Sequence, residues 1–292
     1  IWIKLGGLTF QPGEAAKIIL IIAFAAYLVR TRDALALAGR RLLGVDLPRA
    51  RDLGPILIVW IGALGILGVQ RDLGPSVLLF GIFVLMIFIA TERISWVVLG
   101  LLLILVGGVA ANAVFAHVQV RVDTWLDPFV DPTGQVAQSL YGLAYGGMLG
   151  TGLGQGRPDM IPIAESDFIA AAFGEELGLT GLIAIILLYA LLASRGLRVS
   201  LLLRDPFGKL MAAGLAAGFL LQVFIVIGGV TKLIPLTGLT TPFLSLGGSS
   251  LVMNWVLIAL LIRLSDAARR PAPTTGPTPS ADDAVTQVVK LR

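Results

Sequence analysis

Carboxylates stand at the start of one apolar segment of this sequence and inside it. Asp167 precedes the apolar run, and Glu175 and Glu176 fall within it. A charged side chain at the centre of a bilayer costs about 2.5–3.5 kcal/mol on insertion scales, so such carboxylates are functional candidates. Asp167 and Glu175 would lie about 80° apart around a helix, so both could address one wet cavity. A structural role competes for Asp167, because Ser166 or Asp167 would also make a good helix N-cap.

Three other polar features accompany these carboxylates. Arg121 and Arg157 fit contact with lipid headgroups as their simplest role. The segment TGLGQG (151–156) could cradle phosphate through backbone amides, but no Lys-Ser/Thr pair follows it, so it is not a P-loop. Ser249 lies in GGSS (247–250), where small residues let helices pack closely. A broken helix lining a polar cavity is the alternative for that segment.

The counts of cysteine and histidine limit the chemistry of the chain. It contains no cysteine and a single histidine, His117. These counts exclude a disulfide framework, a cysteine-ligated metal and a histidine-cluster metal site.

The composition indicates that a membrane is the main solvent of the chain. Hydrophobic residues make up 57% of the 292 residues and charged residues only 14%, against roughly 25% charged in soluble domains. A bilayer core about 30 Å thick needs around 20 apolar residues per helix. Seven such stretches follow one another, at about 14–30, 53–69, 75–90, 95–116, 169–193, 210–230 and 242–264. The predicted fold is an all-α polytopic membrane protein with seven transmembrane helices.

The basic residues are distributed unevenly between the connections. If the second span runs outward from the cytoplasm, 16 of the 22 Lys and Arg residues fall on the inside, in 30–52, 91–94, 194–209 and beyond 262. The positive-inside rule therefore fixes the orientation and places 117–168 outside the cell. The net charge of +4 then reflects membrane topology, and nucleic acid is not an expected partner.

Residues 117–168 form the longest connection, and loops of that length are usually functional or disordered. Aromatic residues within it favour order, and 139–156 is predicted to form an amphipathic or re-entrant helix at the outer surface. We expect a transmembrane domain over 1–265 and, because Pro, Thr and Ser are frequent, a disordered cytoplasmic tail over 266–292. No methionine precedes Ile1, which suggests a chain cut from a longer protein.

Six ordered motifs resemble the SEDS family (shape, elongation, division and sporulation), the membrane proteins RodA, FtsW and SpoVE. They are WIKLGGLTFQPGEAAKI (2–18), QRDLGPS (70–76), WLDPFVDPTG (125–134), QSLYGLAYGGMLGTGLG (138–154), ESDFIAAAFGEELGLTG (165–181) and PLTGLTTPFLSLGGSSL (235–251). The resemblance covers 1–265 and looks closer to RodA of actinobacterial type than to FtsW. It implies a fold of ten spans, of which this chain would hold the last seven and lack the first three.

The resemblance also implies an activity: a peptidoglycan glycosyltransferase that polymerises lipid II into glycan strands for cell elongation and shape. Inverting transfer would use Asp167 as general base, on the extracytoplasmic face of the plasma membrane. The candidate substrate-binding residues are Trp2, Arg121, Arg157, Glu175, Glu176, Lys232 and Ser249. The resemblance makes no cofactor certain, and a divalent cation, Mg or Mn, could share the pyrophosphate charge.

The implied partners are lipid II itself, a single-span class B penicillin-binding protein, and the elongation or division complex. Two other functions fit the same membrane architecture. A flippase for lipid-linked peptidoglycan precursors would bind the same lipid, and a structural scaffold would need no Asp167 for growth.

Overall fold

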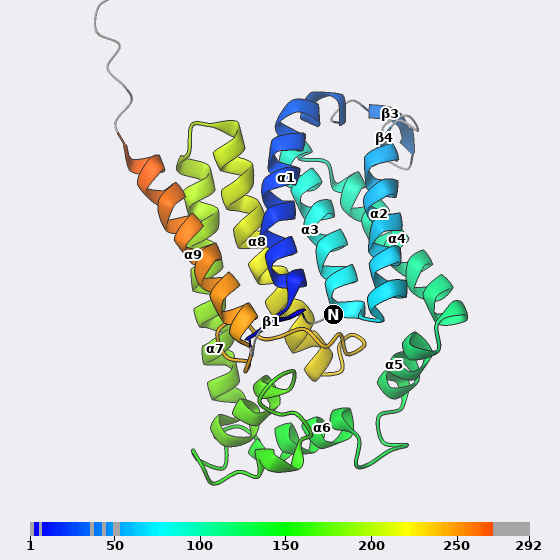
Figure 1. The fold of residues 1–292 in the computed structure, drawn as a ribbon, viewed down its shortest axis with the longest axis vertical. Coiled ribbons are helices and arrows are strands. Elements are labelled where there is room, and N and C mark those ends of the chain that lie inside the picture. Colours follow the sequence, from blue (N-terminus) through cyan, green and yellow to red (C-terminus); the bar gives the residue numbers. More distant parts are fainter. Residues whose placement is uncertain (1–2, 6–7, 36–37, 43–44, 49–52, 271–292) are drawn as a thin grey trace, which may run out of the picture.

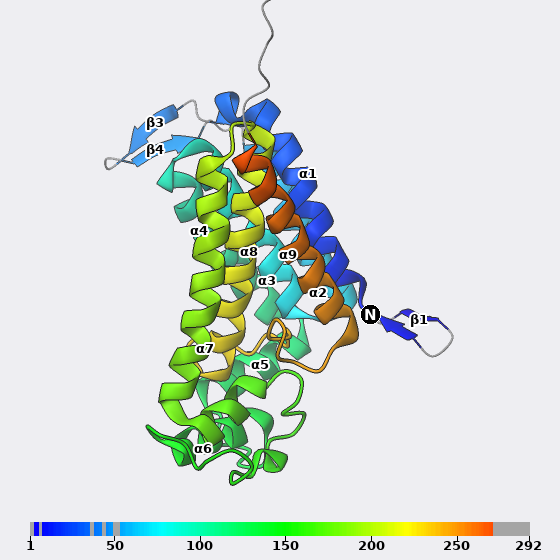
Figure 2. The ribbon, with the colours of Figure 1, turned by 90° about the vertical axis from the view of Figure 1, so that its left-hand side faces the viewer.

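The computed structural model describes residues 3–5, 8–35, 38–42, 45–48 and 53–270. Helices dominate this part of the chain, in the order α1 (Pro12–Leu35), α2 (Gly54–Gln70), α3 (Leu73–Thr91), α4 (Ile94–Val114), α5 (Ala116–Leu126), α6 (Gln135–Gly146), α7 (Ile169–Leu202), α8 (Pro206–Val230) and α9 (Gly248–Arg269). There are two short antiparallel hairpins, β1 (Ile3–Leu5) with β2 (Leu8–Phe10) and β3 (Ala38–Leu42) with β4 (Val45–Pro48). Both project from the helix bundle (Figures 1 and 2).

The long helices run side by side, and α5 and α6 lie together at one end (Figures 1 and 2). We call this the loop end. Within the described residues, six helices are long and apolar enough to span a membrane, and α2 is a shorter apolar helix of 17 residues. The seven predicted spans correspond to α1, α2, α3, α4, α7, α8 and α9, so the chain is an all-α multi-pass membrane protein.

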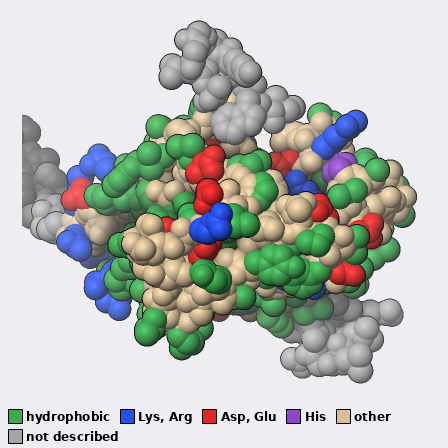
Figure 3. All heavy atoms as spheres, turned by 90° about the horizontal axis from the view of Figure 1, so that it is seen from below, with side chains coloured by type: hydrophobic (Ala, Val, Ile, Leu, Met, Phe, Trp, Pro, Cys, Tyr) green, Lys and Arg blue, Asp and Glu red, His purple; other side chains and the backbone are tan. Residues whose placement is uncertain are grey.

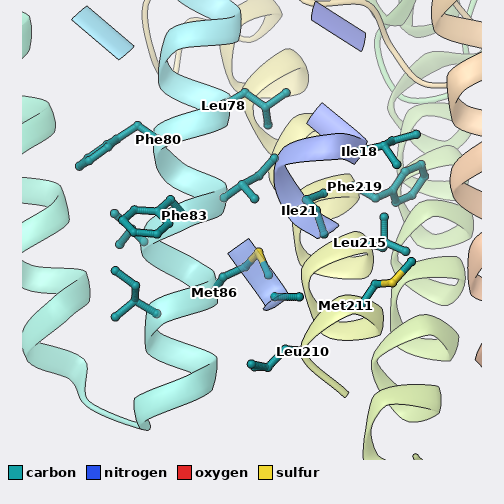
Figure 4. Packing of buried hydrophobic residues seen from close by; sticks show 14 of the residues in the cluster. Ile18, Ile21, Leu78, Phe80, Phe83, Met86, Leu210, Met211, Leu215 and Phe219 are labelled. Carbon is teal, nitrogen blue, oxygen red and sulfur yellow. The ribbon is translucent and has the colours of Figure 1, made fainter. Parts of the chain in front are cut away.

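Helices α3 and α8 form the centre of the bundle. In their most apolar windows 61% and 72% of the residues are buried, against 17% for α9 and 22% for α7. Ile21 of α1, Phe83 of α3 and Leu215 of α8 are sealed from solvent and pack in one cluster (Figure 4). The outer helices therefore direct most of their apolar side chains outward, as helices surrounded by lipid do.

A buried ion pair ties α1 to α8 and to the loop before α9. Lys17 Nζ lies 3.0 Å from Glu14 Oε2 and donates to Gln222 Oε1 at 2.6 Å. The hydroxyl of Thr240 donates to Glu14 Oε1 at 3.2 Å, and Gln222 Nε2 donates to the carbonyl of Thr240 at 3.0 Å. Because buried charges are tolerated only when paired and hydrogen-bonded, this network fixes the loop against the bundle.

Some predicted boundaries are wrong. The last span was expected from 242, but α9 begins only at Gly248, because 241–247 form turns in which Phe243 has φ of 64°. Helix α9 itself continues to Arg269, and the end of the transmembrane domain at 265 stays a prediction. The rest of the predicted tail, 271–292, lies outside the described residues.

The expected helix over 139–156 lies earlier in the sequence than predicted. Helix α6 ends at Gly146, and glycine-rich turns follow it. These turns pair with α7 where that helix is interrupted at Gly178 (φ 69°, ψ −173°). The amides of Thr151 and Gly152 donate to the carbonyls of Glu175 and Glu176, each at 3.0 Å. In return, the amides of Leu179 and Thr180 donate to the carbonyls of Gly147 and Met148.

This pairing explains how irregular backbone is tolerated beside a membrane helix. Two carbonyls and two amides at the interruption find partners in the glycine-rich turns, as a low-dielectric environment favours. The amides of Thr151 and Gly152 belong to the segment predicted as a possible phosphate cradle. Because both already donate to carbonyls of α7, they are not free to bind phosphate.

Candidate active site

A cavity of about 410 Å³ opens at the loop end, among α5, the start of α6, the end of α8 and the loop before α9. Asp167, Arg121 and Lys232 all line it, so the structure brings together three of the residues singled out from the sequence. Asp123, Asp127 and Asp131 line it too. Figure 3 looks onto this end of the molecule, where charged side chains lie among exposed hydrophobic ones.

Asp167 is half-buried and precedes α7 without capping it. The N-cap residue of α7 is Phe168, which is fully buried. The hydroxyl of Ser166 donates to Asp167 Oδ1 at 2.7 Å, and the carbonyl of Ser166 accepts from the hydroxyl of Ser245 at 2.6 Å. The buried Phe168 ring and the Ser245 contact thus anchor the backbone on both sides of Asp167, whose carboxylate faces the cavity.

Arg121 comes to the cavity from α5. Its Nη1 donates to the carbonyl of Leu236 at 2.8 Å. A side-chain carbon added at Gly238, which has φ of 73°, would lie 3.6 Å from Arg121 Nη2 and 3.6 Å from Asp167 Oδ2. The guanidinium and the carboxylate therefore approach the same point of the loop, where the positive φ favours glycine.

Lys232 is held at the other side of the cavity by reciprocal contacts with α5. Its carbonyl accepts from Trp125 Nε1 at 3.1 Å, and its Nζ lies 3.3 Å from the carbonyl of Leu126. Its φ of 62° is uncommon for a residue other than glycine. Such backbone strain persists where the surrounding contacts enforce it, and it clusters at functional sites.

One acidic side chain of the cavity is held in its ionised form. Asp131 Oδ1 accepts from the hydroxyl of Thr133 at 2.7 Å and from its amide at 3.0 Å. The hydroxyl bond first, and the amide bond after it, hold the pKa of Asp131 below its usual range. Together with Asp123, Asp127 and Asp167, Asp131 gives the cavity four carboxylates, which face two cationic side chains, Arg121 and Lys232.

Glu175 and Arg157 meet each other away from this cavity. Glu175 is only 4% exposed, and its Oε1 accepts from the backbone amide of Arg157 at 2.7 Å. The side chain of Arg157 is exposed and Glu176 is half-buried. These three predicted site residues thus belong to the contact between α7 and the turns after α6. Neither Glu175 nor Glu176 lines the cavity that holds Asp167.

Two substitutions at Glu175 separate a structural role from a chemical one. Glu175→Ala leaves the partly buried amide of Arg157 without this partner, and a buried unpaired group would cost roughly 1–3 kcal/mol. Glu175→Gln keeps an oxygen acceptor at the same place. We expect the alanine variant to melt several degrees lower than the glutamine variant, measured by thermal unfolding in detergent. Loss of activity in a Glu175→Gln variant of unchanged melting temperature would instead assign Glu175 a chemical role.

The remaining two predicted residues lie apart from the cavity or outside the described chain. Ser249 is buried in the first turn of α9, where its hydroxyl accepts from the amide of Gln11 at 3.0 Å. Trp2 lies outside the described residues. Sequence reasoning missed two groups at the cavity: Trp125, which lies in α5, and the carbonyl of Leu236, which lies in the loop before α9.

The fold and this polar cavity define a multi-pass membrane protein with a candidate active site at one end of its bundle. Residues 1–270 match the family model for FtsW, RodA and SpoVE, described as cell cycle proteins. The chain belongs to this family.

Curated relatives agree with that assignment. The chain is 54% identical over 277 residues to the peptidoglycan glycosyltransferase RodA of Mycobacterium tuberculosis, covering 94% of this chain and 59% of that protein. It is 36% identical over 275 residues to the stage V sporulation protein E of Bacillus subtilis, covering 92% of this chain and 72% of that protein. The chain therefore spans about three-fifths of the length of the mycobacterial relative.

Solved structures resemble the fold. A chain from a study titled "Structural coordination of polymerization and crosslinking by a peptidoglycan synthase complex" matches with a TM-score of 0.70 at 27% identity, over 92% of this chain and 74% of that chain. The rod shape determining protein RodA of Thermus thermophilus matches with a TM-score of 0.58 at 23% identity, over 92% and 70%. The second likeness supports the fold alone.

Proposed function

We propose that this chain forms the catalytic part of a peptidoglycan glycosyltransferase that polymerises lipid II on the extracytoplasmic face of the plasma membrane. The observation that carries the proposal is the position of Asp167, whose carboxylate lines the cavity at the loop end beside Arg121 and Gly238. The curated names of the mycobacterial RodA and of several FtsW relatives support the reaction class.

The proposed step is an inverting displacement. The 4-hydroxyl of the acceptor sugar attacks the anomeric carbon of the donor, and Asp167 takes the hydroxyl proton. A bond forms between that oxygen and the anomeric carbon, the bond from this carbon to the pyrophosphate oxygen breaks, and pyrophosphate leaves on its lipid carrier. Because pyrophosphate leaves readily, no second carboxylic acid is needed to protonate it, in contrast to glycoside hydrolysis.

Cations are required where the leaving group gains charge. Arg121 and Lys232 line the cavity and are the proposed pyrophosphate ligands there. Arg157, Glu176 and Ser249 lie elsewhere, so we propose roles for them only toward more distant parts of the lipid or glycan. Glu175 supports the turns beside them.

A divalent cation fits this cavity best when the substrate brings part of its ligand set. Four carboxylates line the cavity, but no three Asp, Glu or His side chains converge closely enough to hold a metal ion in the described part of the chain. Mg²⁺ commonly binds one or two carboxylates together with substrate phosphates. A magnesium or manganese ion arriving with the pyrophosphate would also offset the negative lining.

The proposed protein partner is a class B penicillin-binding protein of the elongation or division complex, which would cross-link the new strands. The matched chain from a peptidoglycan synthase complex, whose study title joins polymerization to crosslinking, supports this pairing.

Purified full-length protein in liposomes with labelled lipid II tests the proposal. We expect glycan polymer, resolved by electrophoresis, and no polymer after chelation of divalent cations. Addition of the transpeptidase partner should increase the yield. Movement of labelled lipid II between leaflets without any polymer would overturn the proposal and favour a flippase.

A further inference from the structure

We propose that Asp72 is a positioning residue for Arg121, a second carboxylate that keeps the guanidinium in place and leaves Asp167 free to act as the base. The inference rests on the proposed function and concerns a residue outside the cavity lining. Three observations carry it: how Asp72 is fixed, what the first turn of α3 touches, and which charges act on Asp72.

Asp72 is fixed in the connection between α2 and α3. Its side chain accepts from the amide of Gly74 at 3.1 Å and so caps α3, while its carbonyl accepts from the hydroxyl of Ser76 at 3.2 Å. The preceding residue, Arg71, has φ of 55°. A half-buried carboxylate bound to its own helix has little rotamer freedom left to lose.

The first turn of α3 packs directly on the loop that receives Arg121. A side-chain carbon added at Gly74 would lie 2.7 Å from the carbonyl oxygen of Thr237 and 2.6 Å from Leu239 Cγ. Glycine at 74 therefore permits α3 to touch 237–239. The neighbouring Leu236 carbonyl accepts from Arg121, and Gly238 faces both Arg121 and Asp167.

Arg121 and both carboxylates lie within electrostatic range of one another. Burial raises the pKa of Asp72 above its ordinary value. The hydrogen bond from the Gly74 amide and the positive charge of Arg121 lower this pKa, whereas the negative charge of Asp167 raises it further. A guanidinium has five N–H donors and can serve several acceptors at once. We expect the ionised Asp72 to draw part of the Arg121 charge away from Asp167. Without that charge, Arg121 would be freer to pair with Asp167 and occupy the lone pairs that must receive the proton.

The simpler role for Asp72 is that of a helix cap only, and asparagine separates the two. Asn and Asp are about equally good N-caps, so Asp72→Asn keeps the bond to Gly74 and removes the charge. Because burial raises the pKa of Asp72, its ionisation costs folded-state stability as the pH rises above the carboxyl range. Asp72→Asn should therefore melt no lower than the parent protein at neutral pH.

Asp205 offers a matched control at the opposite end of the bundle. It caps α8 by accepting from the amide of Gly208 at 2.7 Å, so it is also an aspartate N-cap bonded to a glycine amide. Asp205→Asn should leave polymerisation unchanged. Asp72→Ser provides a second test, because serine is also a good N-cap residue and carries no charge. It shows whether an effect of Asp72→Asn comes from the lost charge or from a folding defect caused by asparagine.

The experiment is a double-mutant cycle in the full-length enzyme with labelled lipid II. We expect Asp72→Asn to lower kcat about tenfold, a coupling of the size measured between residues in one charge network. In an Arg121→Gln background the same substitution should have no further effect. Wild-type kcat in both Asp72 variants, or an equal loss with and without Arg121, would overturn the inference. Full activity in Asp167→Asn would instead overturn the proposed function.

Discussion

Asp167→Asn is expected to abolish glycan polymerisation at neutral pH, with a loss of about 10²–10⁴-fold, the usual contribution of a general base. Asparagine has the shape of aspartate and can still accept the hydrogen bond from the Ser166 hydroxyl, but its amide cannot take the proton from the acceptor sugar. The initial rate of polymer formation from labelled lipid II measures the loss. Thermal unfolding and lipid II binding should be unchanged.

Ser166→Ala provides the matched comparison. It removes the hydrogen bond to Asp167 Oδ1 without touching the carboxylate, so we expect a loss of no more than about tenfold, the scale of one hydrogen bond. A loss in Ser166→Ala as large as that in Asp167→Asn would mean that the orientation of this segment, and not proton transfer, limits the reaction.

Gly150→Ala is expected to have the largest effect on stability. Gly150 has φ of 81°, and an added side-chain carbon would overlap the carbonyl of Glu176 and the amide of Gly178. Strain in this backbone region alone costs on the order of 1–3 kcal/mol for a residue with a side chain, and the overlap adds to it. The variant should break the pairing between 147–152 and α7, which thermal unfolding and protease cleavage near 150 would measure.

Gly154→Ala separates the overlap from the strain. Gly154 has φ of 70°, but no atom would lie within 4 Å of an added side-chain carbon. It should therefore lose only the strain energy and melt well above Gly150→Ala. Equal melting temperatures for the two variants would show that the contact with α7 does not stabilise this region.

The membrane helices could be predicted because their physics is local. A run of about 20 apolar residues must satisfy its backbone within itself in a bilayer, so composition and length suffice. Where polar residues and prolines share an apolar stretch, this rule fails. The segment 242–247 has an apolar average but turns before α9, since Thr241 and Ser245 bond to each other and Ser245 bonds to Ser166.

The candidate site was likewise predictable only in part. The acidic and basic residues Asp167, Arg121 and Lys232 were predicted, and the structure places all three around one cavity. The helical spacing argument for Asp167 and Glu175 does not apply, because Asp167 precedes the N-cap of α7. The contact of Gly74, two residues after Asp72, with the loop that receives Arg121 joins residues more than 100 positions apart, which no local pattern reveals.

Chemical rescue tests the central claim, that Asp167 accepts the proton, most directly. Asp167→Ala removes the carboxylate and leaves space in a cavity of about 410 Å³, into which formate can enter as an external base. We predict polymer from lipid II only when formate is added, with a rate that rises with formate concentration, and no such rescue of Arg121→Gln. Polymer formation by Asp167→Ala at the wild-type rate without formate would contradict the assignment.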